Sequence, residues 1–288
     1  MDDLSWDERP RLRSPALVAA FTGWNDAGDA ASLAVRHMID AWGARRVARL
    51  DPEQYFEFQA TRPHVELAEG RTRRIVWPTN ELWAASIPQG DVVLLLGTEP
   101  QLKWRTFCGQ FTQAATELGV SLVVTLGALL ADVPHTREVS ILGTATDDQL
   151  IERFDLQRSR YEGPTGIVGV LHDAVGSAGL PSVSLWAAVP AYAPATPSPK
   201  AALALVERAV GMINLPIGRG ALPGAALEYE QEVSSTVAQD EDLTAYVERL
   251  EGLADAGELD DDHEEDAEVP SVERLVEEVE RFLRDQGD

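Results

Sequence analysis

The residues with the greatest chemical potential lie in short segments that border apolar runs of the sequence. They are Trp24, Asn25, Asp26, Glu99, His135, Arg137, Glu162, Gly163, Thr165 and Gly166. Together they supply an aromatic ring, carboxylates, an imidazole, a guanidinium and glycine-bearing turns. In open α/β sheets, ligands bind beyond the carboxyl ends of the strands, so loops of this kind predict a ligand site at one sheet edge. An equally supported interpretation is a hydrogen-bonded loop scaffold or a subunit contact.

A binding site built from these residues would have a definite chemistry. Arg137 would hold an anionic group of the ligand through two parallel N–H donors. The turn 163–166 would add backbone N–H groups at a helix start, or else Thr165 simply caps that helix. His135 is the candidate for proton transfer near neutral pH, with a neighbouring carboxylate to orient it. We therefore expect these side chains to converge in a single concavity.

Other catalytic classes find no support in the sequence. The five histidines stand at no metal-ligand spacing, and Cys108 is the single cysteine, so no metal site is expected. The phosphate-binding pattern Gly-x-x-x-x-Gly-Lys-Ser/Thr, the dinucleotide pattern Gly-x-Gly-x-x-Gly and the nucleophile pattern Gly-x-Ser-x-Gly are all missing at the expected places. We expect no cofactor, and His135 is the sole catalytic candidate.

Charge and composition restrict the class of partner. The net charge is −24, and residues 228–288 hold 23 of the 48 acidic side chains against four arginines. Nucleic acid is disfavoured, because binding phosphates requires clusters of lysine and arginine. The acidic tail serves either solubility or a contact with a basic protein surface. The start of the chain lacks a signal-peptide pattern and the apolar runs are too short to span a bilayer, so we expect a cytoplasmic protein without a membrane contact.

Apolar runs separated by helical patterns predict the elements that position the loops. Four runs are typical of strands buried on both faces of a sheet: 16–21, 91–97, 121–126 and 183–189. Shorter strands are predicted at 47–50, 55–59, 74–77, 83–87 and 139–145. Helical patterns follow Asn25, which would cap the first of them, and also precede Gly119, cover 147–154, follow Gly166 and cover 200–213. A long loop is expected over 127–137.

This alternation predicts a three-layer αβα sandwich with a mostly parallel or mixed sheet. The predicted organisation is an N-terminal arm (1–14), an α/β core domain (15–223), a helical segment (224–253), an acidic linker (254–270) and a C-terminal amphipathic helix (271–288). The helical segment is either one long helix or two shorter ones with a break near Asp240. The last helix would carry an apolar stripe, which is unstable in water. We expect it to dock on its own domain or on a neighbouring subunit.

Several strings in the chain carry a family resemblance. They are GWNDAGDA at 23–30, LGTEP at 96–100, LGALLADVPHTR at 126–137, YEGPTGIVGVL at 161–171, SLWAAVPAY at 184–192 and ERFLR at 280–284. In this order they resemble the actinobacterial branch of the proteasome-assembly-chaperone family, second-subunit type. Two positions depart from the family pattern: Ala191 replaces a histidine and Glu138 replaces a proline. The resemblance implies a phosphorylase/hydrolase-like α/β core, plus proteasome-related protein partners.

The sequence is consistent with two functions. The first is a non-catalytic interaction or assembly factor, supported by the resemblance and by the missing catalytic motifs. The alternative is a phosphorylase- or hydrolase-like enzyme acting on a nucleoside or another small anionic ligand, supported by the loop residues. A closed homo-oligomer is also expected, with a trimer by analogy to relatives of the fold.

Overall fold

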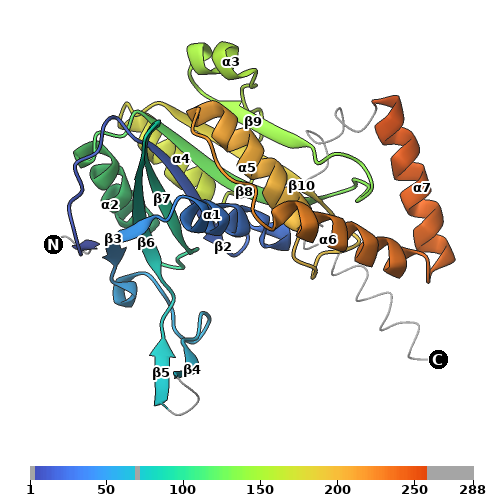
Figure 1. Cartoon of the computed structure of the whole chain (residues 1–288), viewed down its shortest axis with the longest axis horizontal. Coiled ribbons are helices and arrows are strands. Elements are labelled where there is room, and N and C mark those ends of the chain that lie inside the picture. The colour runs from blue at the N-terminus through green and yellow to red at the C-terminus, as the bar shows by residue number, and fades with distance from the viewer. Residues whose placement is uncertain (1–3, 69–71, 258–288) are drawn as a thin grey trace, which may run out of the picture.

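A mixed eight-stranded sheet forms the centre of the molecule (Figure 1). The structure is a computed structural model that describes residues 4–68 and 72–257. The strands lie in the order β1-β3-β6-β7-β2-β8-β10-β9. Their bounds are β1 Leu4–Trp6, β2 Ala16–Thr22, β3 Arg45–Leu50, β6 Asn80–Ile87, β7 Gly90–Thr98, β8 Leu122–Ala131, β9 Ile141–Ala145 and β10 Ser182–Pro190.

The four apolar runs of the sequence occupy the middle of this sheet. Strands β7, β2, β8 and β10 are neighbours and run parallel, while the flanking strands pair antiparallel. Parallel strands are covered on both faces, which explains why these segments show no polar alternation. Their carboxyl ends therefore point to one edge of the sheet, where the loops of interest leave.

Helices cover both faces, so the three-layer αβα architecture is confirmed. Helices α1 (Ala30–Ala41) and α5 (Pro199–Ile213) pack on one face, and α2 (Trp104–Glu117) and α4 (Ile167–Ser177) pack on the other. Each face encloses its own apolar core. The helix α3 (Asp148–Phe154) contacts β9 at the sheet margin. Cys108 lies on the buried face of α2, and burial raises the pKa of its thiol to about 12.

Two helices and one hairpin project from this body (Figure 1). Helices α6 (Leu222–Val237) and α7 (Glu241–Ala256) follow α5, and Asp240 caps α7 through its side chain. The predicted break near Asp240 thus separates two helices, and α7 extends into the first residues of the expected linker. Strands β4 (His64–Ala68) and β5 (Thr72–Val76) form a separate two-stranded sheet. The remaining linker and the predicted helix 271–288 lie outside the described residues.

Several local predictions were wrong. Residues 55–59 form no strand. They form turns and irregular structure directly after the short 3-10 helix η2 (Pro52–Gln54). The expected loop at 127–137 begins later, since β8 extends through Ala131 by pairing with β10. Asn25 does not cap α1: the 3-10 turn η1 (Ala27–Asp29) intervenes, and the cap position belongs to Asp29. Strand β1 also places part of the predicted N-terminal arm in the sheet.

Candidate functional site

The loop after β2 is fixed to the neighbouring strand β8. The backbone carbonyl of Asn25 accepts from Ala128 N–H (2.8 Å), and Asp26 forms an isolated parallel bridge with the same residue. Gly23 begins this loop with φ 129°, a conformation that favours glycine, and a Cβ there would meet Glu99. Asn25 is 1% exposed, so its side chain is packed into the fold, whereas the side chain of Trp24 is 66% exposed.

Glu99 is the centre of the first polar cluster. Its Oε1 accepts from Asn25 Nδ2 (2.8 Å) and from the backbone N–H of Ile167 (2.9 Å), and its Oε2 accepts from Trp24 N–H (3.4 Å). Gly166 lies so close to Asn25 that an added Cβ would stand 2.1 Å from the amide oxygen. The sequence-predicted segments around 24, 99 and 166 therefore do come together at the sheet edge.

This cluster occupies the anion position at the start of α4. The first N–H groups of a helix have no intrahelical acceptor and attract negative charge. Gly166 is the N-cap residue and has no side chain, so the carboxylate of Glu99 serves as the acceptor. The expectation that Thr165 caps this helix was wrong. The place where a ligand anion would bind is taken by a carboxylate of the protein itself.

Asp26 serves the neighbouring helix α1. One carboxylate oxygen accepts from the N–H groups of Ala31 (2.7 Å) and Ser32 (3.2 Å). Burial raises the pKa of Asp26, against the lowering effect of the hydrogen bonds from Ser32 and Ala31. Its other oxygen and the amide oxygen of Asn25 are buried without a hydrogen-bond partner among residues 4–68 and 72–257. Asp26 thus stabilises the entry of α1, and it does not reach His135 or Arg137 in any described hydrogen bond.

The segment 161–165 forms an exposed turn in front of α4. The hydroxyl of Tyr161 donates to the carbonyl of Pro164 (2.8 Å), which folds the ring over Gly163. Glu162 and Thr165 are exposed. These exposed residues stand apart from the packed cluster around Glu99, which Gly166, the next residue of the chain, does join.

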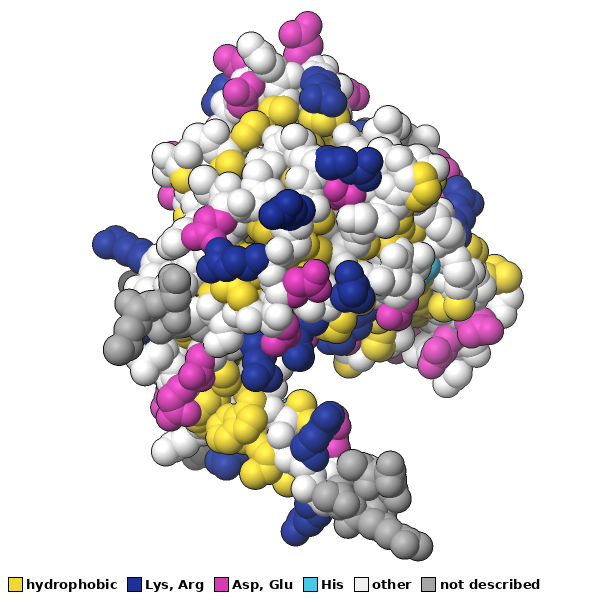
Figure 2. All heavy atoms as spheres, turned by 60° about the vertical axis from the view of Figure 1, so that its left-hand side comes forward, with side chains coloured by type: hydrophobic (Ala, Val, Ile, Leu, Met, Phe, Trp, Pro, Cys, Tyr) yellow, Lys and Arg dark blue, Asp and Glu magenta, His cyan; other side chains and the backbone are white. Residues whose placement is uncertain are grey.

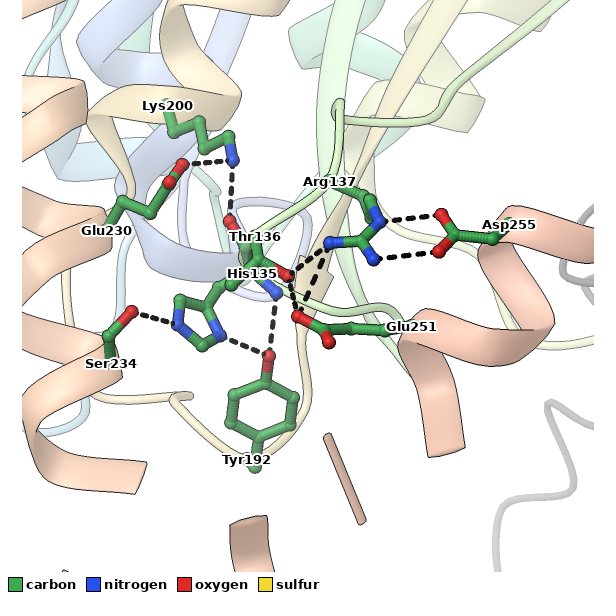
Figure 3. A network of polar contacts seen from close by, with 9 residues as sticks. All are labelled: His135, Thr136, Arg137, Tyr192, Lys200, Glu230, Ser234, Glu251 and Asp255. Atoms are coloured by element: carbon green, nitrogen blue, oxygen red, sulfur yellow. Dashed lines mark hydrogen bonds and ion pairs between the residues drawn. The ribbon is translucent and has the colours of Figure 1, made fainter. Parts of the chain in front are cut away.

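His135 and Arg137 belong to a second cluster, which joins the loop after β8 to α6 and α7 (Figure 3). His135 is 3% exposed. Its backbone N–H donates to Tyr192 Oη (2.7 Å), and its ring atoms Nδ1 and Nε2 lie 2.8 Å from Tyr192 Oη and 2.8 Å from Ser234 Oγ. Because Tyr192 has a single hydroxyl proton, we assign that proton to the Nδ1 contact, so Nε2–H donates to Ser234. Burial lowers the pKa of His135, which favours this neutral form.

Arg137 is paired with carboxylates of α7. Its Nε and Nη2 donate to the two carboxylate oxygens of Asp255 (2.7 and 2.8 Å), and its Nη1 lies 3.4 Å from Glu251. Thr136 also donates to Glu251. The hydrogen bonds from Arg137 lower the pKa of Asp255. The two-pronged grip predicted for a ligand is therefore made with the protein's own helix.

A lysine completes the second cluster. Lys200, in the first turn of α5, donates to the carbonyl of His135 (2.5 Å) and to Glu230 of α6 (2.6 Å). Sequence reasoning missed the partners Tyr192, Lys200, Glu230, Ser234, Glu251 and Asp255. The available signals were Lys200, one of only two lysines in an arginine-rich chain, and Tyr192, two residues after β10. Neither signal predicts which residue is the partner, because the contacts in this cluster join residues that are 30 to 118 positions apart in the sequence.

The candidates thus share one edge of the sheet but form two clusters. The first consists of Asn25, Glu99, Gly166 and the backbone N–H of Trp24. In the second, His135 and Arg137 contact α6, α7 and Tyr192, which follows β10. The N–H of Ser198 at the start of α5 donates to the carbonyl of Gly28 (2.7 Å) between them. A pocket of about 280 Å³ lies elsewhere, between α1 and β6, and is lined by residues such as Arg36 and Glu81 but by none of the candidates.

The described residues offer no ready metal centre. No group of three or more histidine, cysteine or acidic side chains close enough to hold a metal ion occurs within 4–68 and 72–257. In the same part of the chain, no helix has the length and apolar character required to cross a bilayer.

Comparison with protein-family models identifies the chain. The model of the PAC2 family matches residues 20–237. The chain belongs to the PAC2 family. The match begins in β2 and ends with α6, so it contains His135 and Ser234. Helix α7, whose Asp255 binds Arg137, lies beyond the matched residues.

Solved structures agree with this assignment. A PAC2 family protein from Streptomyces avermitilis is 47% identical, with a TM-score of 0.75, over 81% of this chain and 99% of that chain. A proteasome-assembly chaperone homologue from Mycobacterium tuberculosis is 44% identical, with a TM-score of 0.74 and the same coverage. PbaB of Pyrococcus furiosus, an archaeal proteasome activator, is 20% identical with a TM-score of 0.68, a likeness of fold. No curated protein sequence matches the chain.

Proposed function

We propose that this PAC2 protein is a non-catalytic assembly factor that binds protein partners, with proteasome subunits as the partner class. The observation that carries the proposal is the use of the polar residues at the sheet edge. Glu99 is the acceptor for α4, Asp26 for α1, and Arg137 is bound to α7. An acid, base or anion-binding group engaged in this way is unavailable to a substrate. The names of the relatives from Mycobacterium tuberculosis and Pyrococcus furiosus supply the partner class.

The buried state of His135 also supports a non-catalytic role. A general base has to reach the proton of a substrate, within about 3 Å. Both ring nitrogens of His135 already contact hydroxyl groups, and the side chain is buried beneath α6. The imidazole therefore joins the loop after β8 to α6, where it orders a surface that a protein partner can bind.

The experiment is a reconstitution of proteasome assembly. Separately purified proteasome subunits from the source organism are mixed with and without the full chain, and assembled particles are followed on native gels over time. The expected result is faster assembly or a higher yield when the chain is present. An inert protein of equal net charge serves as the control. Assembly that is equal in both mixtures would contradict the proteasome as the partner class.

The phosphorylase- or hydrolase-like enzyme is the competing assignment, and it makes a different prediction. An enzyme of that class would bind a nucleoside or small anion at the sheet edge and would lose binding when Arg137 is replaced. The assembly proposal predicts that calorimetric titration with nucleosides and inorganic phosphate gives no binding heat. A saturable heat that disappears in Arg137→Gln would overturn it in favour of the enzyme.

A further inference from the structure

The β4–β5 hairpin carries an apolar face that the described part of the molecule does not cover. Opposed residues of an antiparallel pair share a face, and Val65 pairs with Ile75 while Leu67 pairs with Arg73. Val65, Leu67 and Ile75 are 55%, 64% and 57% exposed. Figure 2 shows hydrophobic and basic side chains together on this projection, away from the body. A two-stranded sheet with one exposed apolar face is marginally stable alone, so a covering partner is expected.

The hairpin is basic on an otherwise acidic protein. Its described residues in 62–68 and 72–77 hold three arginines and one glutamate, a net charge of +2, whereas the whole chain carries −24. One of these arginines, Arg73, stands on the apolar face beside Leu67. The chemistry of this face therefore fits a partner that is both apolar and acidic.

The chain itself contains such a segment. Residues 258–288 hold fourteen acidic side chains and three arginines, a net charge of −11. Within them, 271–284 repeats apolar residues at a helical spacing: Val272, Leu275, Val276, Val279, Phe282 and Leu283. The helices that precede this segment would repel it, because 222–257 holds nine acidic side chains and one arginine.

Geometry favours a hairpin on another molecule. The end of α7, where the described chain stops at Gly257, and the hairpin lie on opposite sides of the body (Figure 1). Thirteen residues, 258–270, separate Gly257 from the apolar repeat. To reach its own hairpin, this linker would have to pass around the domain, which restricts its conformations and costs entropy. A neighbouring copy can place its hairpin beside α7 without that cost.

We infer that the apolar face of the β4–β5 hairpin binds the acidic amphipathic segment 271–284 of a second copy of this chain. Each copy then donates its C-terminal segment to the hairpin of the next, a heterologous contact that closes into a ring or continues as a filament. The inference goes beyond the proposed function, because this self-association requires no other protein.

Disulfide trapping in the full-length chain tests the contact directly. Leu67→Cys and Val279→Cys are placed on separate chains of different mass, which are co-expressed and oxidised. Cys108 is buried and its pKa is raised to about 12, so it stays unreactive. The control pairs Val279→Cys with Leu227→Cys, an exposed residue of α6. The expected result is roughly tenfold more mixed disulfide for the hairpin pair, because docking raises the effective concentration.

A second chain, with Leu67→Cys and Val279→Cys together, separates the possible occupants. A cross-link within one chain, without mixed disulfide in the first experiment, would overturn the second copy as occupant. A yield at the control level in both experiments would overturn the contact itself.

Sedimentation equilibrium provides the independent measurement. We expect full-length protein to self-associate at about 10 µM. Leu67→Glu and Phe282→Glu should each raise the dissociation constant of this self-association by roughly tenfold or more. Leu227→Glu should leave the association unchanged. A monomeric parent protein, or a Leu67→Glu variant that associates like the parent, would overturn the inference. Equal circular-dichroism melting curves would establish that the variants fold alike.

Discussion

The carboxylate of Glu99 connects segments that lie far apart in the sequence. It accepts hydrogen bonds from the loop after β2 and from the first turn of α4. A carboxylate in a loop at the carboxyl end of a strand is typical of an active site, and here it has a structural role. The functional and the structural role have opposite effects on stability. Residues kept for function often lower the stability of a protein, whereas a carboxylate that caps a helix raises it.

Replacing Glu99 should therefore destabilise the protein. In Glu99→Ala, the Asn25 amide and the Ile167 N–H lose their acceptor while they stay buried. We expect the free energy of unfolding to fall by about 1–3 kcal/mol, the usual cost of leaving such groups unpaired. Urea denaturation measures this, with Glu162→Ala on the exposed turn as the control, which should change stability by less than about 0.5 kcal/mol. An unchanged or higher stability in Glu99→Ala would instead assign the residue a functional role.

The protonation of His135 gives a prediction about pH. Burial lowers its pKa in the folded protein, so the unfolded chain binds the proton more readily. Stability from this group is complete above the unfolded pKa of about 6.5 and is lost as pH falls toward the folded value. The parent protein should thus lose more stability between about pH 8 and about pH 5.5 than His135→Gln does. Identical pH profiles in urea denaturation would show that the histidine does not titrate with unfolding.

At the scale of elements, helix α7 depends on the loop after β8. It packs lightly on α6, through the small cluster of Tyr229, Val233, Val237 and Val247. Its links to the loop after β8 are the ion pairs of Arg137 with Asp255 and Glu251, and the hydrogen bond from the Tyr246 hydroxyl to Asp132 (2.7 Å). These pairs are partly exposed and contribute little to the global free energy of unfolding. They can still decide how often this helix opens locally.

Removing the arginine should loosen α7 without unfolding the domain. In Arg137→Ala, we expect backbone amides in 241–257 to exchange with deuterium several-fold faster, while those in β8 and α5 stay protected. Arg158→Ala, which removes an ion pair with Asp148 of α3, is the matched control and should leave α7 unchanged. Mass spectrometry of the exchanged peptides measures the difference. Equal exchange of α7 in both variants would contradict the coupling to the loop.

The sequence predicted the elements well where the signal is local. The apolar runs 16–21 and 91–97 become β2 and β7, because strands buried on both faces need apolar residues at every position. The predicted convergence of the loops at one sheet edge follows from the same parallel order. The prediction stopped at long-range contacts: the amphipathic pattern of α6 says which face is apolar, but it does not say that Ser234 meets His135. The sequence therefore did not reveal that the candidates divide between a cluster around Glu99 and a cluster around His135 and Arg137.

At the scale of the whole molecule, charge and shape are distributed unevenly. The β4–β5 hairpin lies on one side of the molecule and helices α6 and α7 lie on the other (Figure 1). The hairpin has a net positive charge in its described residues, whereas 222–257 is strongly acidic. Polar residues between them are engaged in holding loops and helices in place. This arrangement suits a protein that binds other proteins through its projections, and it leaves the sheet edge as their rigid support.

The most direct test of this account is native mass spectrometry of the tagged full-length protein, purified gently from its source organism. We predict complexes in which the chain is bound to protein partners in whole-number stoichiometry. We also predict that organic extraction of the same sample releases no stoichiometric nucleoside or small anion. A sample without protein partners, or one that releases a small anionic ligand at about one molecule per chain, would contradict the central claim.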